Sequence, residues 1–290
     1  MWLSLALLCA LLVGTGDILS KIALQKSREG VVGLSRLLFA LPILGGVAWV
    51  RGIPTLRGPF WWTLLGMIPF ELSAYLLYLR AIRIAPLSLT VPFLALTPVF
   101  TIVSSWILLG EKVSFIGALG IFAVTAGAYL LHLDRTREGW LAPVLSLFRE
   151  RGSRFMIFAA FLYSITSNLG KRAIQLSNPF AFAFLYQLIV AFALFILLWR
   201  GSSSIRVLGR EILSQWKVYS LLGSVMAFAF LAHCLGIAQA PVPYFIAIKR
   251  TSLIVGVVFG GVLFQEKKMG QRVVATALMV LGVAFIALFP

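Results

Sequence analysis

Apolar segments long enough to cross a bilayer occupy nearly the whole sequence. Hydrophobic residues make up 61% of the 290 residues and charged residues only 12%, whereas a soluble domain has about 25% charged residues. A membrane-spanning helix needs about 20 mostly apolar residues, and backbone polar groups cannot stay unpaired in lipid. The composition therefore predicts an all-α, polytopic membrane protein. Ten segments meet the length requirement: 2–24, 31–50, 59–79, 87–109, 113–131, 154–174, 180–199, 217–238, 243–264 and 270–289.

The two halves of the sequence repeat one pattern. Ala85-Pro86 precedes Glu111-Lys112, and 155 residues later Ala240-Pro241 precedes Glu266-Lys267 with the same spacing. A second pair of matching stretches lies earlier in each half, at Ser20–Gln25 and Gly170–Gln175. Because each half holds five spans, an odd number, the second copy must enter the membrane in the opposite direction. The sequence therefore predicts two inverted five-helix repeats.

Basic residues indicate how these spans are oriented. Most of the 25 Lys and Arg residues, which give a net charge of +16, follow the odd-numbered spans. The positive-inside rule puts those loops in the cytoplasm and both termini outside. We expect a first repeat over 1–131, a basic loop over 132–153 and a second repeat over 154–290. No folded basic domain is present to bind nucleic acid, so the lipid bilayer is the expected partner of the positive charge.

Several short stretches match a known family pattern. They are Arg36-Leu37-Leu38, Thr97–Thr101, Leu108–Lys112 and Gln265–Lys267. With these stretches the chain resembles the EamA-type transporters of the drug/metabolite transporter superfamily over essentially its whole length. The resemblance implies a transporter with both termini in the cytoplasm, the reverse of the orientation that the charges indicate, and both orientations remain open.

Lys249 and Arg250 are the sharpest local signal. Lys249 lies about 9 Å into the ninth span, where an ionised side chain needs water, a partner or an anion. Leu253, Gly256 and Gly260 share a face with Lys249, which predicts that this face packs on another helix. The two cations either bind a substrate or extend to the headgroups. The pair is also similar to the adjacent Lys-Arg pair of the plastid phosphate translocators, and this resemblance implies a role in binding phosphate.

Other polar residues inside the spans are candidates for the substrate site. Glu71, Tyr75 and Tyr78 form one stripe on the third span. Three roles are open for Glu71: a counter-ion for the cations, a protonatable coupling group, or a neutral carboxyl that serves packing. His233 and Asn168 are further candidates for the wall of the site, and each can equally be hydrogen-bonded within the core.

Two other groups of charged residues have structural interpretations. Asp17 and Lys21 are spaced for mutual neutralisation on one helix face. Glu111 and Glu266 are expected to end helices and to orient the turns that follow them.

Together these features predict a secondary transporter, or permease, for a small polar and anionic metabolite, in a bacterial cytoplasmic (inner) membrane. The alternative is a flippase for a polyprenyl-phosphate carrier. An intramembrane enzyme is less favoured, because the candidate acid and base residues show no recognisable spacing. No catalytic residue, metal site or cofactor is expected, and no P-loop motif is present. The expected partners are the small-molecule substrate and a coupling proton or ion, and the sequence is compatible with a homodimer.

Overall fold

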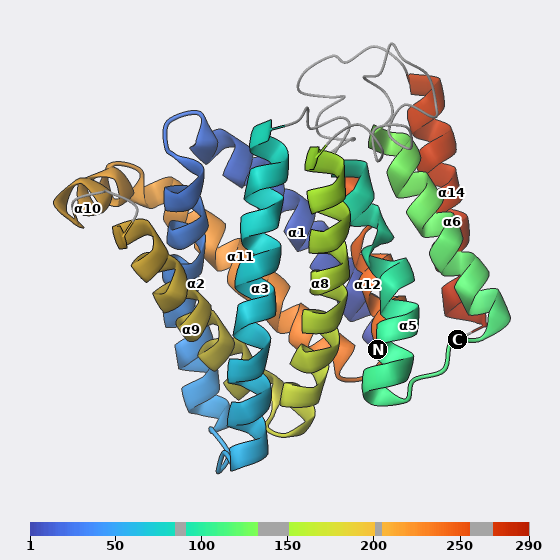
Figure 1. Ribbon diagram of the computed structural model, residues 1–290, viewed down its shortest axis with the longest axis horizontal. Coiled ribbons are helices and arrows are strands. Elements are labelled where there is room, and N and C mark those ends of the chain that lie inside the picture. The colour runs from blue at the N-terminus through green and yellow to red at the C-terminus, as the bar shows by residue number, and fades with distance from the viewer. Residues whose placement is uncertain (85–90, 133–150, 201–204, 256–268, 290) are drawn as a thin grey trace.

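The computed structural model describes residues 1–84, 91–132, 151–200, 205–255 and 269–289 (Figure 1). All regular secondary structure in these ranges is helical. The elements are α1 (Trp2–Leu24), α2 (Glu29–Arg51), α3 (Gly58–Ile84), the 3₁₀ helix η1 (Val91–Leu96), α5 (Thr97–Leu109), α6 (Phe115–His132), α8 (Arg151–Gln175), α9 (Pro179–Arg200), α10 (Ile205–Ser214), α11 (Trp216–Ile237), α12 (Val242–Lys249) and α14 (Met269–Leu288).

Most of the described helices fall where the apolar segments predict them. Five described helices contain a stretch long and apolar enough to cross a membrane: α1, α2, α3 over Gly58–Tyr78, α9 over Pro179–Trp199, and α11. Shorter apolar helices cover Phe93–Leu109, Phe115–Leu130 and Val274–Leu288. A helix pairs its backbone groups within one segment, which is the condition for crossing lipid. The described chain is therefore an all-helical protein of the multi-pass membrane type.

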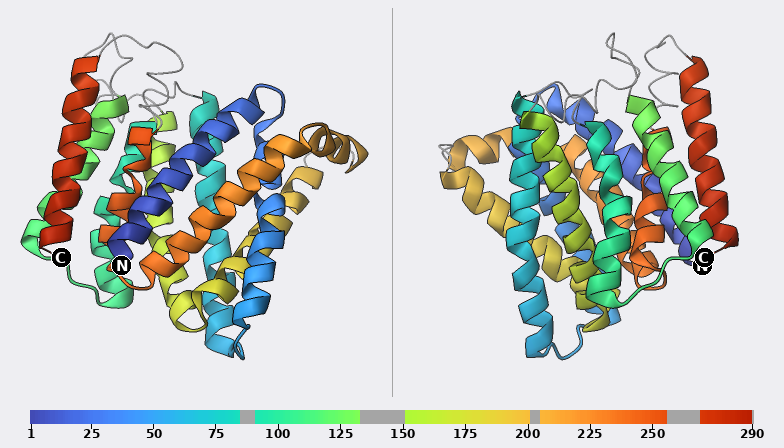
Figure 2. Two further views of the ribbon diagram at one scale, coloured as in Figure 1. Left: turned by 180° about the vertical axis from the view of Figure 1, so that it is seen from behind. Right: turned by 45° about the vertical axis from the view of Figure 1, so that its right-hand side comes forward.

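Helices of the first half pack mainly on helices of the second half. α3 lies along α8, α1 lies along α11, and α2 contacts both α9 and α11. Figure 2 shows α6 and α14 as a pair at one side of the other helices. The chain therefore does not form two separate bundles, and the space between the helices is lined by both halves.

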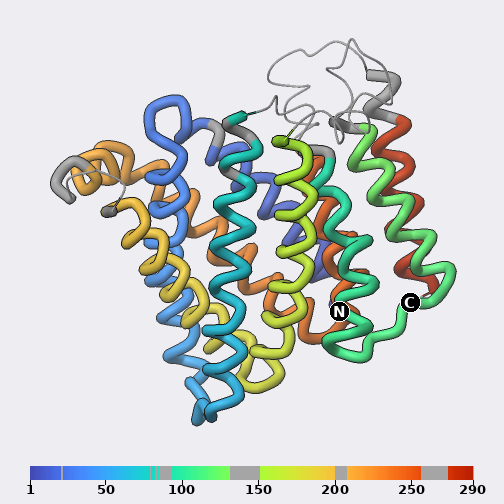
Figure 3. Tube along the Cα trace, in the orientation of Figure 1, coloured from blue at the N-terminus to red at the C-terminus, as the bar shows by residue number. Residues whose placement is uncertain are grey.

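Both termini lie at the same end of the bundle (Figures 1 and 3). We call this the terminal end. The turn between α1 and α2 lies at the opposite end, together with α10 and the start of α11. We call this the basic end, because Lys26, Arg28, Arg210 and Lys217 belong to these segments.

Glycines bring α6 and α14 into backbone contact. A Cβ on Gly120 would lie 2.7 Å from the carbonyl oxygen of Gly282, and a Cβ on Gly127 would lie 2.6 Å from that of Ala275. A shift of 155 residues turns Gly120 into Ala275 and Gly127 into Gly282. The shift by one repeat thus converts each contact into the other. This is the relation expected when two antiparallel copies are related by a two-fold axis.

The sequence predicts only a loop between α9 and α11, but the structure contains an additional helix there. α10 buries Leu208 against Val31 and Leu34 of α2, whereas Leu213 is exposed. The helix is too short to cross a bilayer, so the criterion of span length does not detect it. Its apolar face packs on the bundle, as in an amphipathic helix that lies along a surface.

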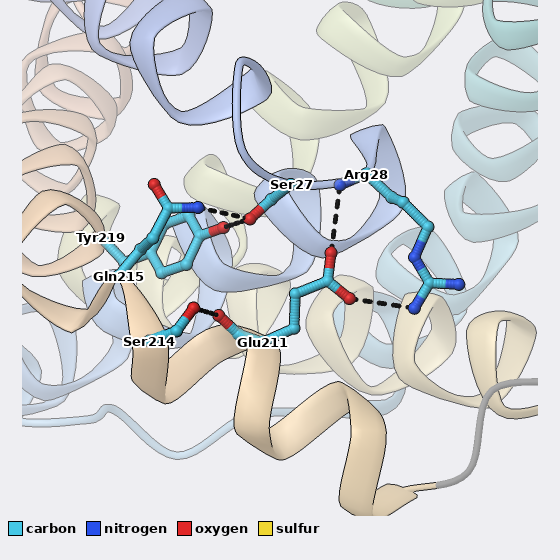
Figure 4. Close-up of polar contacts among 6 residues, drawn as sticks. All are labelled: Ser27, Arg28, Glu211, Ser214, Gln215 and Tyr219. Atoms are coloured by element: carbon cyan, nitrogen blue, oxygen red, sulfur yellow. Dashed lines mark hydrogen bonds and ion pairs between the residues drawn. The ribbon is translucent and has the colours of Figure 1, made fainter.

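Polar contacts tie α10 and α11 to the turn between α1 and α2 (Figure 4). Glu211 Oε2 accepts a hydrogen bond from Arg28 Nη2 at 2.9 Å, and Glu211 Oε1 accepts one from the Arg28 backbone N–H at 3.2 Å. Ser27 Oγ accepts from Gln215 Nε2 at 2.6 Å and from the Tyr219 hydroxyl at 2.7 Å. The Arg28 side chain is 58% exposed, so its ion pair contributes less than about 1 kcal/mol.

This ion pair makes the attachment of α10 sensitive to pH. Burial alone would raise the pKa of the Glu211 carboxyl, but the hydrogen bonds and the charge of Arg28 outweigh burial and hold this pKa below its ordinary value. A lowered carboxyl pKa stabilises the folded arrangement above the ordinary pKa, and the contribution is lost as the pH falls through the lowered value.

We expect a spin label at Leu213→Cys, in protein with Cys9→Ala and Cys234→Ala, to gain mobility between about pH 5 and about pH 3. Electron paramagnetic resonance measures this mobility directly. In the Glu211→Gln variant the mobility of the label should no longer depend on pH over this range. If the mobility of the label in the parent protein did not change over this pH range, the role of the Arg28–Glu211 ion pair in holding α10 would be contradicted.

Candidate functional site

α12 ends at the two basic residues that the sequence singles out. Residues 250–251 form a turn, and residues 252–255 are helical again. The Ile248 carbonyl accepts hydrogen bonds from the Thr251 N–H at 2.9 Å and the Thr251 hydroxyl at 2.7 Å. A side-chain hydroxyl that competes for a backbone carbonyl disturbs a helix in this way. The expectation of an unbroken helix over 243–264 is therefore wrong, and Gly256 and Gly260 lie outside the described residues.

The first half is interrupted at the matching position. η1 is a 3₁₀ helix, and α5 begins at Thr97 directly after it. A shift of 155 residues places Leu94–Leu96 on Lys249–Thr251. The two interruptions meet, because Arg250 Nη2 donates a hydrogen bond to Thr97 Oγ1 at 2.9 Å. Interrupted helices at corresponding positions of two halves are typical of substrate sites in secondary transporters.

Lys249 and Arg250 retain free hydrogen-bond donors. Lys249 is partly exposed, and no acceptor in the described part of the chain lies within hydrogen-bonding distance of its Nζ. Arg250 is partly exposed as a residue, yet its Nε is buried and has no hydrogen-bond partner among the described residues. Ionised groups at membrane depth require water, a partner or an anion, and these two side chains can hold an anion.

Burial along α12 changes abruptly at Lys249. All residues from Val242 to Ile248 are buried, whereas Lys249 and Arg250 are partly exposed. α12 starts at the terminal end of the bundle (Figures 1 and 2). Side chains therefore fill the bundle around α12 from the terminal end up to Lys249, and accessible polar surface begins there.

Asp17 extends this polar surface toward the basic end. It lies in the last third of α1 and is solvent-accessible although protein atoms surround it closely. Its carboxyl interacts electrostatically with Arg36 of α2, Lys249 and Arg250. The side chain of Lys21, its expected partner, lies outside the described atoms. Asp17 thus belongs with the cations of the candidate site.

Glu71 of α3 is the second carboxyl near the cations. Its side chain faces the hydroxyls of Thr166 on α8 and Tyr186 on α9, and lies within electrostatic range of Lys249. Tyr75 and Tyr78 follow on the same helix, and both interact with Arg36. The structure thus brings the predicted stripe on α3 to the predicted cations on α12. We call the following residues the polar cluster: Asp17, Arg36, Glu71, Tyr75, Tyr78, Lys249 and Arg250.

His233 lies beside the polar cluster and is surrounded by aromatic rings. Its ring stacks on Phe230 with centroids 5.8 Å apart and meets Phe245 edge-on at 5.2 Å. Phe230 in turn lies 5.3 Å from the Tyr186 ring. His233 Nδ1 is buried without a hydrogen-bond partner in the described residues. His233 also lies within electrostatic range of Lys249.

Asn168 occupies a different place from the other candidates. It is fully buried between α5 and α8. Its amide donates hydrogen bonds to Ser104 Oγ and to the Ser164 carbonyl, both at 2.8 Å. The structure does not bring Asn168 to the polar cluster, and its part in substrate binding stays a prediction.

Four residues that the structure places at or beside the polar cluster were not predicted from the sequence to belong to the site. They are Arg36, Thr97, Tyr163 and Tyr186. Arg36 carried a usable signal, because it is a cation in the second turn of a predicted span. The two tyrosines lie on α8 and α9 among many other aromatic residues, and no spacing distinguishes them.

The sequence profile of the EamA-like transporter family matches residues 1–133 and 151–288. The chain belongs to the EamA-like transporter family. No curated protein matches it significantly. One solved structure, described only as "Crystal structure of protein", has a TM-score of 0.79 and 19% sequence identity, over 99% of this chain and 96% of that chain. At this identity the likeness shows the fold alone.

The family match confirms the resemblance seen in the sequence. This EamA-like protein is a multi-pass membrane transporter of the drug/metabolite transporter superfamily. The hydrogen bond between Arg250 and Thr97 joins the two halves of the chain.

Proposed function

We propose that this EamA-like transporter is a secondary transporter that carries a small, polar, anionic metabolite across a bacterial cytoplasmic membrane. One observation carries the proposal. Two adjacent cations with unused donors, Lys249 and Arg250, lie where the interrupted helices of the two halves meet. An anionic group of the substrate supplies the acceptors that the described protein does not.

In this proposal the ten spans form two inverted five-helix repeats, over 1–131 and 154–290, joined by the basic loop 132–153. Three features support it. The glycine contacts between α6 and α14 exchange under a shift of 155 residues, the interruptions at η1 and at Arg250 fall at matching positions, and the main helix contacts join one half to the other. Such repeats provide two equivalent arrangements, open to opposite sides.

The residues of the polar cluster have distinct roles in this proposal. The guanidinium of Arg250 binds the carboxylate or phosphate with paired N–H groups, and Lys249 adds a second charge. Asp17 and Glu71 partly balance the cations in the empty site, so that the site is not left with two uncompensated charges. The Tyr75 and Tyr78 hydroxyls bind polar groups elsewhere on the substrate.

Transport in this proposal is driven by an ion gradient or by exchange. The substrate enters from the basic end, toward which Asp17 extends the polar cluster, and leaves after the halves have moved and closed that end. Glu71 is positioned to couple a proton to this cycle, because its carboxyl faces hydroxyls and a cation within the bundle.

A thermal-shift screen against carboxylates, phosphate esters and phosphonates tests the proposal. A ligand at about 100 times its Kd stabilises the native state by about 2.7 kcal/mol. We expect an anionic solute to raise the unfolding temperature and then to be carried into vesicles of purified protein. Stabilisation and uptake restricted to cationic or neutral solutes would contradict the proposal. Copurifying polyprenyl-phosphate lipid, with no uptake of any soluble solute, would favour the flippase.

A further inference from the structure

Four hydrogen bonds converge on Glu111 and Lys171 at the terminal end. Glu111 Oε1 accepts from Lys171 Nζ at 2.5 Å. Glu111 Oε2 accepts from the Val242 backbone N–H at 2.8 Å and from the Ser105 hydroxyl. Lys171 Nζ also donates to the Ala240 carbonyl at 2.6 Å. A residue of each half thus holds the backbone at the start of α12.

This ion pair is less exposed than the one at the basic end, mainly because its cation is buried. The side chains of Lys171 and Glu111 are 8% and 13% exposed, whereas those of Arg28 and Glu211 are 58% and 19% exposed. Water and salt screen an exposed pair and weaken it, and a pair removed from water is screened much less. Breaking a buried pair also leaves an uncompensated charge. The two ends of the bundle are therefore held unequally.

The same contacts determine where the candidate substrate site lies. Glu111 and Lys171 fix the first residues of α12, and Lys249 is its last residue. A helix of eight residues is a rigid rod about 12 Å long. Displacing the start of α12 therefore displaces Lys249 and Arg250, so closure at the terminal end and the position of the cations are coupled.

We propose that Glu111 and Lys171 form a lock that keeps the terminal end closed and positions Lys249 and Arg250 for a ligand entering from the basic end. The terminal end opens when the lock releases the start of α12. This inference rests on the proposed alternating access, and Glu111 and Lys171 act in it as positioning residues. The residues that match by the sequence repeat, Lys21, Ala85 and Glu266, lie outside the described side chains.

Pulsed electron paramagnetic resonance can measure closure without any substrate. In protein with Cys9→Ala and Cys234→Ala, nitroxides at Lys112→Cys and Gln239→Cys flank the lock on two exposed turns. We expect one short distance in this parent protein in nanodiscs. Lys171→Met should raise the population at a longer distance at least fivefold. Glu211→Gln, which breaks the ion pair at the opposite end, is the matched control and should leave the distribution unchanged.

The exchanged pair, Glu111→Lys with Lys171→Glu, separates a lock from a simple ion pair. Charge attraction is kept, but a lysine at position 111 cannot accept from the Val242 N–H, and a glutamate at position 171 cannot donate to the Ala240 carbonyl. We expect the long-distance population to persist. A return to the short distance in the exchanged pair, or no change in Lys171→Met, would overturn the inference.

Ser105→Ala provides a mild variant if Lys171→Met does not fold. It removes one donor to Glu111 and keeps both charges, and we expect a twofold or greater rise in the long-distance population. A distribution identical to that of the parent protein would count against the lock. Because these measurements need no solute, a shifted distribution without transport of any anion would sustain the lock and refute the proposed function.

Discussion

Arg250→Ala is expected to weaken binding of the transported anion by roughly 10- to 150-fold. A hydrogen bond to a charged group contributes about 1.5–3 kcal/mol, and each 1.4 kcal/mol changes the affinity tenfold. Among the described residues the Arg250 side chain donates one hydrogen bond, to Thr97 Oγ1, and its Nε has no partner. Lys249→Ala should have an effect of the same order. Calorimetric titration of detergent-purified protein with the best anion from the thermal-shift screen measures both.

Two further variants make this result specific. Arg250→Lys keeps the charge but not the planar fork, so it should recover only part of the lost affinity. Lys217→Ala removes an exposed cation at the start of α11 and should leave the affinity unchanged. If Lys217→Ala were as damaging as Arg250→Ala, the loss would reflect overall charge and not a site.

Gly282→Ala is expected to lower the unfolding temperature by roughly 3–10 °C, because overpacking costs about 1–3 kcal/mol. The added Cβ would lie 2.6 Å from the carbonyl oxygen of Gly120 and 2.8 Å from the backbone N of Val124. Backbone atoms cannot rotate away as a flexible side chain can, so α6 and α14 must separate. Thermal unfolding of the purified protein measures the loss.

Gly66→Ala is the matched control for this prediction. Gly66 also lies inside a helix, α3, but a Cβ there would meet nothing within 4 Å. Alanine is favoured over glycine in a helix interior by about 0.5–1 kcal/mol, so this variant should be neutral or slightly more stable. Equal losses in both variants would show that α6 and α14 are not held by close backbone contact.

The sequence predicts the spans well because the bilayer fixes their length and polarity. α1 occupies the residues predicted for the first span, and α2 and α14 differ from their predicted segments by at most two residues at either end. The length and polarity required of a span do not predict α10, because a helix at a surface need only be amphipathic. The same criterion does not predict the interruption at Arg250, because the Thr251 hydroxyl competes for a backbone carbonyl inside an otherwise apolar segment.

The candidate site was only partly predictable, for a related reason. Helical spacing places Glu71, Tyr75 and Tyr78 on one face, and depth in the membrane identifies Lys249 as unusual. Neither signal says which helices face each other. The contacts between Arg250 and Thr97, and between Glu111 and Lys171, join segments 153 and 60 residues apart. Only the packing of the two halves brings these residues together.

Thiol labelling tests most directly whether the cations line a water-accessible site. In protein with Cys9→Ala and Cys234→Ala, Lys249→Cys places a thiol at the first accessible residue of α12, and Ala247→Cys places one two residues earlier, where the chain is 0% exposed. A membrane-impermeant, water-soluble reagent applied at the basic end should modify position 249 at least ten times faster than position 247. Equal rates at both positions, or no modification of position 249 in folded protein, would contradict the account.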